Sequence, residues 1–180
     1  RPNADDPRLM LAHAFDGWDV DVEGAMTWRR VDEGIEFSSG AAPGGLLLYR
    51  CLAADKAYRM AGLGPQDIDV AEVHDATSFC EIYQCEMLRF CPEGEGGRFI
   101  ASGATGPGGK LPVNTSGGLV SKGHPVGATG LSMLAELATQ LRGEGGVRQV
   151  KGAEIALAEN GGGVIGMEEA VASVVILKKE

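Results

Sequence analysis

The sequence predicts a layered α/β fold, because strand-like and helix-like segments alternate along much of the chain. Residues 68–73 alternate apolar with small or acidic side chains, as a strand does, and an apolar stripe at helical spacing follows at 79–90. A second helix-like segment begins at Gly127 and leads to two short apolar runs, 153–158 and 170–177. A glycine-rich turn joins these two runs, so we expect them to close the fold as an antiparallel pair.

The first third of the chain is less regular. Residues 9–15 are apolar and predict a strand, whereas 18–28 fit either a helix or a strand. A stretch rich in Gly, Pro and Ser, 38–45, then leads into 46–61, where apolar residues recur at helical spacing. Gly62 follows directly and predicts the end of an amphipathic helix.

The middle of the chain combines one predicted helix with a long loop. Thr77 or Ser78 is the expected N-cap of the helix at 79–90, because a hydroxyl can accept a hydrogen bond from the first amides of a helix. The following Gly- and Pro-rich residues, 92–118, predict a loop. The helix after Gly127 is expected to end at Gly143, with these residues on its buried face: Leu131, Leu134, Ala138 and Leu141.

Composition limits the classes of function. The 180 residues are 44% hydrophobic, enough for the core of one domain spanning 1–180. A net charge of -9 argues against a nucleic-acid or anionic-membrane surface, because binding to phosphates needs clustered Lys and Arg. No apolar run approaches the ~20 residues that cross a bilayer, and the first residues lack signal-peptide character. These features predict a cytoplasmic protein.

The cysteines are expected to be free thiols. None of Cys51, Cys80, Cys85 and Cys91 forms a CxxC pair, and the last three fall within one predicted helix and its end. We therefore favour buried or half-buried thiols over metal ligands and expect no metal in this chain.

Two of the three histidines lie where α/β proteins tend to place functional residues. His74 follows the strand-like segment 68–73, and His124 comes just before the helix that begins at Gly127. His13 lies inside an apolar run and is a weaker candidate.

The glycine-rich segment around His124 resembles the signature loop of the thiolase superfamily. Residues 114–130 read Asn-Thr-Ser-Gly-Gly-Leu-Val-Ser-Lys-Gly-His-Pro-Val-Gly-Ala-Thr-Gly. Two further blocks match in the right order: His74-Asp75 is similar to the sterol-carrier-protein type of thiolase, and the block that begins at Glu159 stands where many thiolases have Cys-x-Gly-Gly-Gly. The resemblance implies a C-terminal thiolase half-domain, with helices layered on a mixed five-stranded sheet.

The same resemblance implies roles for individual residues. His124 would activate a nucleophile and, with a water held by His74, stabilise the thioester oxygen as an enolate forms. The Gly161 backbone N–H would serve a second oxyanion hole. Asn114 would order the loop, and Asn160 either belongs to the site or orients its own loop.

Two departures from the family pattern affect the expected chemistry. The nucleophilic Cys of the family belongs to an N-terminal half-domain, so it would lie in a missing segment or on another chain. Glu159 stands in place of the acid/base Cys. It could still move a proton if burial raised its pKa, or it could be a residue at a strand end.

The leading hypothesis is a CoA-dependent thiolase that cleaves or forms a 3-oxoacyl-CoA. The alternative is a retro-aldolase acting on a β-hydroxyacyl-CoA, for which Tyr49, Tyr58 and Tyr83 are the candidate proton carriers, although their helical spacing favours core packing. A third hypothesis is a non-catalytic subunit that binds acyl-CoA. The resemblance implies coenzyme A as substrate and the partners of a thiolase: an N-terminal half or companion subunit, further copies in an oligomer, and a zinc-ribbon/OB-fold protein.

Overall fold

The computed structural model describes residues 26–31, 34–39, 45–162 and 171–179. Side chains are described for residues 53–162 and 172–179. The chain forms two compact units, Arg1–Gly45 and Leu46–Glu180, and each is described by itself.

The first unit contains a hairpin of two antiparallel strands, β1 (Met26–Val31) and β2 (Gly34–Ser39). Its register pairs Val31 with Gly34 and Met26 with Ser39. The segment 18–28 fitted either a helix or a strand, and its last residues, from Met26, belong to strand β1. The strand expected at 9–15 lies outside the described residues.

The second unit is built on a mixed sheet with the strand order β3-β4-β5. Strand β3 (Val70–Val73) runs parallel to β4 (Ile155–Gly162), and β4 pairs antiparallel with β5 (Val171–Lys178). The expected α/β architecture and the closing antiparallel pair are confirmed. The expectation of five strands was wrong: within the described residues this sheet has three, because β1 and β2 pair with each other in a separate two-stranded sheet.

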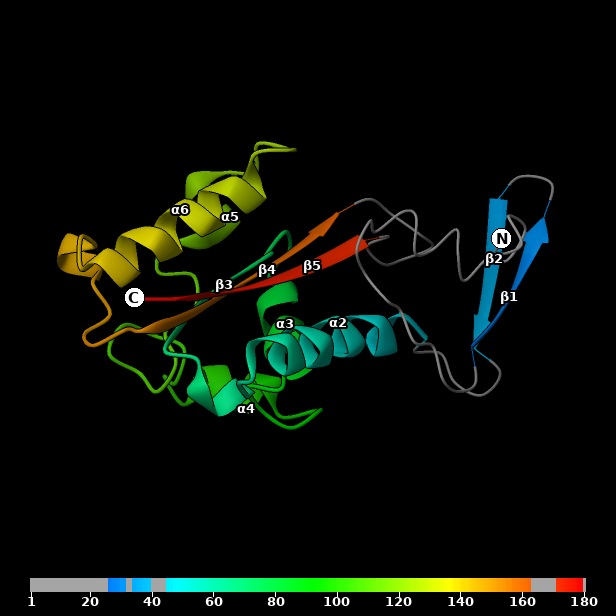
Figure 1. Ribbon diagram of the computed structural model, residues 1–180, viewed down its shortest axis with the longest axis horizontal. Helices are drawn as coiled ribbons and strands as arrows, with labels where there is room; N and C mark the ends of the chain where they lie inside the picture. The colour runs from blue at the N-terminus through cyan, green and yellow to red at the C-terminus, as the bar shows by residue number, and fades with distance from the viewer. Residues whose placement is uncertain (1–25, 32–33, 40–44, 163–170, 180) are drawn as a thin grey trace. The chain divides into compact units, whose positions relative to one another are not determined.

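Helices cover both faces of this sheet (Figure 1). Helix α6 (Thr129–Arg142) packs on β4 and β3, and the short α5 (Gly118–Lys122) is drawn beside it. Helices α2 (Gly45–Ala61), α3 (Cys80–Met87) and α4 (Gly96–Ala101) occupy the opposite side. Two 3-10 turns, η1 (Pro65–Asp67) and η2 (Gly146–Arg148), precede β3 and β4. None of the helices in the described part of the chain is long and apolar enough to cross a bilayer.

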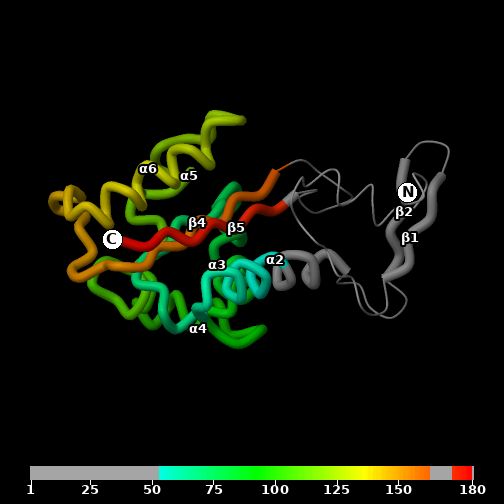
Figure 2. The backbone as a smooth tube through the Cα atoms, viewed as in Figure 1, coloured from blue at the N-terminus to red at the C-terminus, as the bar shows by residue number. Residues whose placement is uncertain are grey.

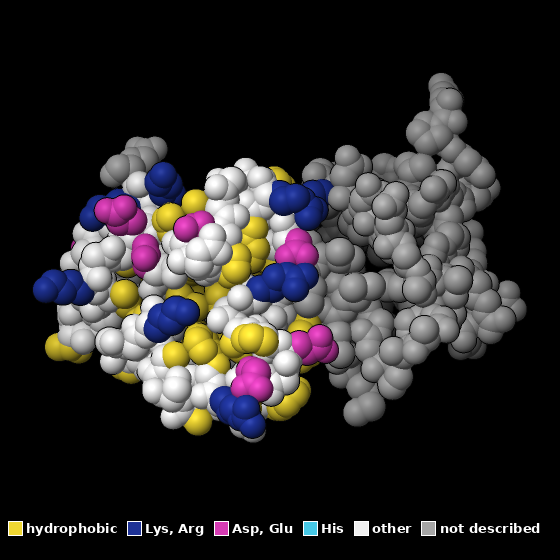
Figure 3. Space-filling model, turned by 90° about the horizontal axis from the view of Figure 1, so that it is seen from below, with side chains coloured by type: hydrophobic (Ala, Val, Ile, Leu, Met, Phe, Trp, Pro, Cys, Tyr) yellow, Lys and Arg dark blue, Asp and Glu magenta, His cyan; other side chains and the backbone are white. Residues whose placement is uncertain are grey.

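The pleat of β4 divides the core between these two layers. Ala156 and Ala158 join the cluster formed with α6, whereas Leu157 joins the cluster formed with α2 and α3. Figure 3 shows the outer surface on the side of α2, α3 and α4, where acidic and basic side chains are interspersed. Such mixing gives that face no single-sign field for binding a polyanion.

Several helix boundaries follow the sequence closely. Helix α2 ends before Gly62, and α6 ends at Gly143, each with the positive φ that glycine tolerates (65° and 78°). Helix α3 is shorter than the predicted 79–90. Its N-cap is Phe79 rather than Thr77 or Ser78, and the backbone carbonyl of Thr77 accepts the hydrogen bond of the Cys80 N–H.

Two expectations about the helices were wrong. The expected buried face of α6 was wrong at Leu131, which is 70% exposed. Leu141 is buried as expected, and the fully buried apolar side chains of this helix are Met133 and Leu137. The Gly- and Pro-rich residues 92–118 are not a loop throughout, since α4 lies within them. Its first turn is held by a contact from another helix, because the Gly96 N–H donates to Glu86 at 2.8 Å, and local sequence signals do not encode such a contact.

Candidate active site

Parallel pairing of β3 and β4 brings two distant blocks of the sequence to one end of the sheet. Val73 is the register partner of Glu159, and the next residue, His74, donates its backbone N–H to Glu159 Oε2 at 3.2 Å. Both side chains are buried, with 4% of His74 and 1% of Glu159 exposed. Figure 2 traces the backbone of β4, and the parallel register places β3 beside it. The expected site residues His74 and Glu159 are therefore neighbours.

The two candidate histidines are in direct contact. The rings of His74 and His124 are 4.9 Å apart between centroids and inclined by 70°, an edge-to-face arrangement. Such contacts are favourable because the positive edge of one ring meets the negative face of the other. His74 is buried at the end of β3, whereas His124 is exposed on the loop before α6. The arrangement leaves one ring open to a reactant and backs it with the other.

The orientation of the His124 ring is set by Thr129, which was not among the residues expected at the site. Its Nδ1 lies 2.7 Å from Thr129 Oγ1, and that hydroxyl donates to the Pro125 carbonyl at 3.3 Å. When this hydroxyl donates to the carbonyl, its oxygen can accept an Nδ1–H from the ring. The neutral ring then carries its lone pair on Nε2, the atom that can act as a base. Thr129 is itself part of the motif, five residues after His124, which was the available signal.

Asn114 fastens the start of the glycine-rich loop to β3. It has a left-handed backbone (φ 55°), a conformation that asparagine tolerates better than most residues. Its Oδ1 accepts the Val73 N–H at 2.9 Å, and its Nδ2 donates to Glu81 Oε2 at 3.1 Å. These hydrogen bonds fit the expectation that Asn114 orders the loop. A part for Asn114 in catalysis stays a prediction.

Asp75 holds the beginning of α5 against the end of β3. Its Oδ1 accepts the Leu119 N–H at 2.7 Å. The carboxylate also lies so close to Gly118 that a Cβ there would collide with it, and Gly118 has a φ of 63°. Both features require glycine at this position.

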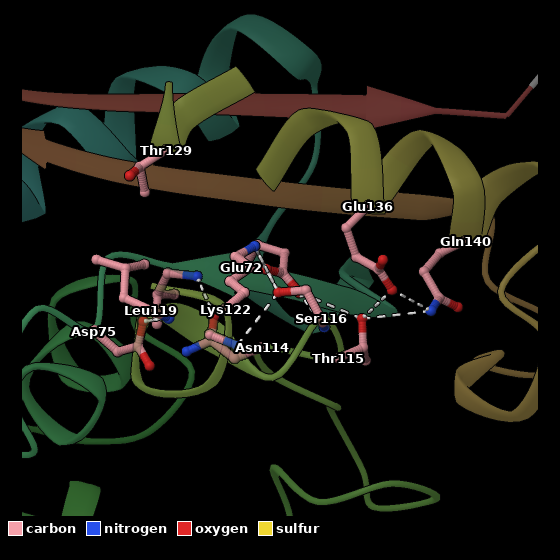
Figure 4. Close-up of polar contacts among 12 residues, drawn as sticks. Glu72, Asp75, Asn114, Thr115, Ser116, Leu119, Lys122, Thr129, Glu136 and Gln140 are labelled. Carbon is pink, nitrogen blue, oxygen red and sulfur yellow. Dashed lines mark hydrogen bonds and ion pairs between the residues drawn. The ribbon is translucent and has the colours of Figure 1, made fainter. Parts of the chain in front are cut away.

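A buried carboxylate on β3 organises the rest of the loop. Glu72 is fully buried, and its oxygens accept the Ser116 N–H at 2.9 Å, the Ser116 hydroxyl at 2.5 Å and the Thr115 hydroxyl at 3.4 Å. Lys122 Nζ lies 3.3 Å from Glu72 Oε2 and 2.7 Å from Ser116 Oγ (Figure 4). Glu72 was not among the residues expected at the site. The available signal was an acidic residue within a strand that is otherwise buried.

The second buried carboxylate beside this loop belongs to α6. Burial alone would raise the pKa of Glu136, but hydrogen bonds from Arg148 and Gln140 outweigh burial and hold that pKa below its ordinary 4.5. Thr115 links the two carboxylates, because its hydroxyl is also 3.2 Å from Glu136 Oε1 (Figure 4).

Glu81 shows the opposite electrostatic effect. Burial raises the pKa of Glu81 above its ordinary 4.5, although the hydrogen bond from Asn114 acts against the rise. The negative charges of Asp75 and Glu72 add to the rise. The charge of Glu81 therefore depends on its burial and on the carboxylates beside it.

The residues after Glu159 continue the strand instead of leaving it. Strand β4 runs to Gly162, so Glu159 lies inside the strand and not at its end, as the segment 153–158 had suggested. Asn160 and Gly161 pair with Ser173 and Ala172 of β5. The Asn160 side chain reaches Gly130 on α6, where an added Cβ would lie 3.4 Å from it.

Two of the described cysteines, Cys85 and Cys91, are poorly suited to be nucleophiles. Burial raises the pKa of the Cys85 thiol and, together with the charges of Glu86 and Glu95, the pKa of the Cys91 thiol. A raised pKa disfavours the thiolate, which is the reactive form. In the part of the chain with described side chains, no group of three or more His, Cys, Asp or Glu could hold a metal ion.

Tyr58, one of the three candidate proton carriers, belongs to the core. Its side chain is buried, and its hydroxyl donates to the Leu88 carbonyl at 2.9 Å. Burial raises its pKa, and the nearby Asp55 carboxylate raises it further. Tyr83 packs near Phe79, with 6.1 Å between ring centroids, and the side chain of Tyr49 lies outside the described ones.

The fold and the paired histidines define a thiolase-like domain, and residues 50–179 match the thiolase C-terminal domain-like family. The chain belongs to that family. This confirms the resemblance of the loop at 114–130 to the thiolase superfamily.

Individual relatives extend this assignment. The chain is 56% identical over 108 residues to "Sterol carrier protein 2" of Rattus norvegicus, covering 60% of this chain and 20% of the relative. It is 53% identical over 114 residues to "Acetyl-CoA acetyltransferase" of Methanothermobacter thermautotrophicus, covering 63% and 30%. Among solved structures it is similar to "Ltp2-ChsH2(DUF35) aldolase", with a TM-score of 0.62 and 30% identity over 72% of this chain and 31% of that one. The chain thus spans between 20% and 31% of the length of these relatives.

Proposed function

We propose that this chain supplies the histidine half of a thiolase active centre, which cleaves or forms the carbon–carbon bond of a 3-oxoacyl-CoA. The observation that carries the proposal is the contact between His74 and His124, with His124 Nδ1 held by Thr129. An exposed imidazole with a free Nε2 lone pair can take a proton from a thiol and return it to a carbanion.

The other expected residues have parts in the same scheme. The protonated His124 and a water bound to His74 would donate hydrogen bonds to the thioester oxygen as it becomes an enolate, and the Gly161 N–H would serve the acyl-transfer intermediate. Glu159, buried beside the His74 backbone, would be the acid/base group in place of a cysteine. Asn114 and Asn160 would hold the loop and the strand on which these groups lie.

The nucleophilic cysteine would come from outside this chain, in an N-terminal half-domain or companion subunit. The raised pKa values of Cys85 and Cys91 support this. So do large apolar side chains that are exposed on the segments around the histidine pair, because such surfaces are usually covered by protein. They are Phe79 (63% exposed), Val120 (77%), Val126 (87%) and Leu131 (70%).

Several features of the whole protein belong to this proposal. We infer that 1–180 is one part of a larger cytoplasmic assembly, with coenzyme A as substrate and more than one copy or kind of subunit. A zinc-ribbon/OB-fold companion remains part of the proposal, and the "DUF35" component in the name of the similar aldolase is consistent with a companion protein.

The test is a thioester-cleavage assay on the natively isolated assembly, with a panel of aliphatic, aromatic and steroid 3-oxoacyl-CoA esters. Turnover is expected to need free CoA and to fall by a factor of about 10² to 10⁴ in His124→Ala. His13→Ala is the control, since His13 lies outside the three sequence blocks that carry the site. Turnover that persists in His124→Ala would contradict the proposal.

A second candidate is a retro-aldolase that acts on a β-hydroxyacyl-CoA. The similar aldolase structure and the carboxyl group of Glu159 at the position of a thiolase cysteine favour it. The two functions differ in their need for CoA, because thiolysis consumes it and aldol cleavage does not. Release of a ketone or aldehyde without free CoA would identify the aldolase, and binding of CoA esters without any turnover would indicate a non-catalytic subunit.

A further inference from the structure

Lys122 has an unusual position for a lysine next to a candidate active site. Its side chain is only 22% exposed, and its ammonium group is directed inward, 3.3 Å from Glu72 Oε2 and 2.7 Å from Ser116 Oγ. The Ser116 hydroxyl donates its proton to Glu72 and accepts from Lys122, so the three groups form one closed polar cluster (Figure 4). Lysine usually keeps its charge in water unless it is paired.

The three members come from parts of the chain that meet only in the fold. Glu72 is on β3, two residues before His74, and Lys122 is the last residue of α5, two residues before His124. Gly123 then turns the chain with a φ of 84° toward His124. Fixing the Lys122 side chain to β3 therefore fixes the end of the helix from which the His124 backbone departs.

We propose that Lys122, held by Glu72 and Ser116, is a positioning residue that keeps His124 against His74. The proposal rests on the proposed function, because its kinetic test measures the turnover of a CoA ester. Neutralising the buried Glu72 carboxylate is the second effect of this lysine, because a buried charge without a cation is strongly disfavoured. A purely structural ion pair would stabilise the fold as a whole. A positioning residue acts through His124.

The experiment compares Lys122→Met with Lys122→Arg in the full native assembly, and the exposed Lys151→Met is the matched control. In Lys122→Met, kcat is expected to fall about 10- to 100-fold, because small misplacements of a catalytic group are costly. The KM is expected to stay within about twofold. Lys122→Arg should recover part of the loss, and Lys151→Met should resemble the parent.

Two further measurements separate positioning from general stabilisation. Combined with His124→Ala, Lys122→Met should cause no further loss, because the two changes act on the same group. Amide hydrogen exchange should speed up in the segment 115–128 and not elsewhere. An additional loss of activity in the His124→Ala background, or exchange that is unchanged or faster everywhere, overturns the inference.

Failure of the proposed function gives a different result from failure of this inference. If the parent assembly turns over no CoA ester, the proposed function fails, and the exchange measurement alone decides the position of the loop. Faster exchange confined to 115–128 then shows that Lys122 keeps the segment before His124 in place. Unchanged exchange overturns the inference.

Discussion

At the scale of single residues, one hydroxyl group holds the ring of His124. Thr129 is buried at the first position of α6, and its hydroxyl lies 2.7 Å from Nδ1 of the ring and donates to the Pro125 carbonyl at 3.3 Å. The contact fixes the direction of Nε2 and favours the tautomer with the proton on Nδ1. The side chain that performs this task has no charge and would escape a search for titratable groups.

Thr129→Val keeps the size of this side chain and removes the hydroxyl. We expect turnover to fall by roughly 10²-fold, because the ring loses its preferred tautomer and orientation. The free energy of unfolding should drop by only about 1 kcal/mol, since water can reach the exposed His124. Steady-state kinetics and chemical denaturation check both values.

The control for this change is Thr139→Val in the same helix. The Thr139 hydroxyl donates to the Ala135 carbonyl at 2.8 Å, far along α6 from His124, so this variant should keep full turnover. Equal losses in the two variants would show that the Thr129 effect comes from the helix and not from the histidine.

At the scale of elements, the short helix α5 exists because of contacts outside itself. It has five residues, and its N-cap, Gly117, offers no side-chain hydrogen bond. Asp75 instead accepts the Leu119 N–H, and Lys122 at the other end is bound to Glu72. Isolated helices of this length are unstable in water, so the strand β3 supplies what the helix lacks.

Gly118→Ala tests the fit between α5 and β3. The added Cβ would meet the Asp75 carboxylate and would occupy a backbone with a φ of 63°, so we expect a loss of about 1–3 kcal/mol in stability. Urea denaturation measures it. Gly97→Ala is the control, because α4 leaves open space there, and it should be neutral or slightly stabilising.

The contact of α6 with the sheet is tested by truncating its buried face. Leu137 is fully buried, so Leu137→Ala should cost about 2–5 kcal/mol in the free energy of unfolding. Val147→Ala, at a fully exposed side chain, should change stability by less than ~0.5 kcal/mol. A loss for Leu137→Ala as small as that for Val147→Ala would contradict the burial of Leu137.

At the scale of the whole molecule, two buried carboxylates and two cations link the glycine-rich loop to both layers of the fold. Glu72 is matched by Lys122, and Glu136 by Arg148, whose guanidinium lies 2.9 Å away. The Thr115 hydroxyl lies between the two carboxylates. The loop that leads to His124 is therefore coupled to the electrostatics of the domain.

The Glu136 pair predicts how stability depends on pH. Because the folded-state pKa of Glu136 lies below its ordinary 4.5, its contribution is present above pH 4.5 and is lost as the pH falls through the folded-state value. Glu136→Gln should cost about 1–2 kcal/mol at pH 7, and the difference from the parent should shrink below pH 4.5.

Denaturation curves from pH 3 to 8 give this comparison. Glu95→Gln is the control, because the Glu95 pair with Arg98 is exposed and screened by water. A gap between parent and Glu136→Gln that stays constant down to pH 3 would contradict the assigned direction of the pKa shift.

Elements whose signals are local could be predicted from the amino-acid sequence. The alternation of 68–73, the helix ends at Gly62 and Gly143, and the closing strand pair all depend on neighbours within a few residues. The loop motif also identified the family, because its residues are contiguous.

The contacts that the motif residues make depend on the folded chain. The bond from the His74 N–H to Glu159 spans 85 positions, and the pair of Glu72 with Lys122 spans 50. Such partners are chosen by strand register and by the cost of leaving a buried charge unpaired, and neither is written in local spacing. For the same reason the phase of α6, which exposes Leu131 and buries Met133, followed from the sheet it covers and not from its apolar pattern.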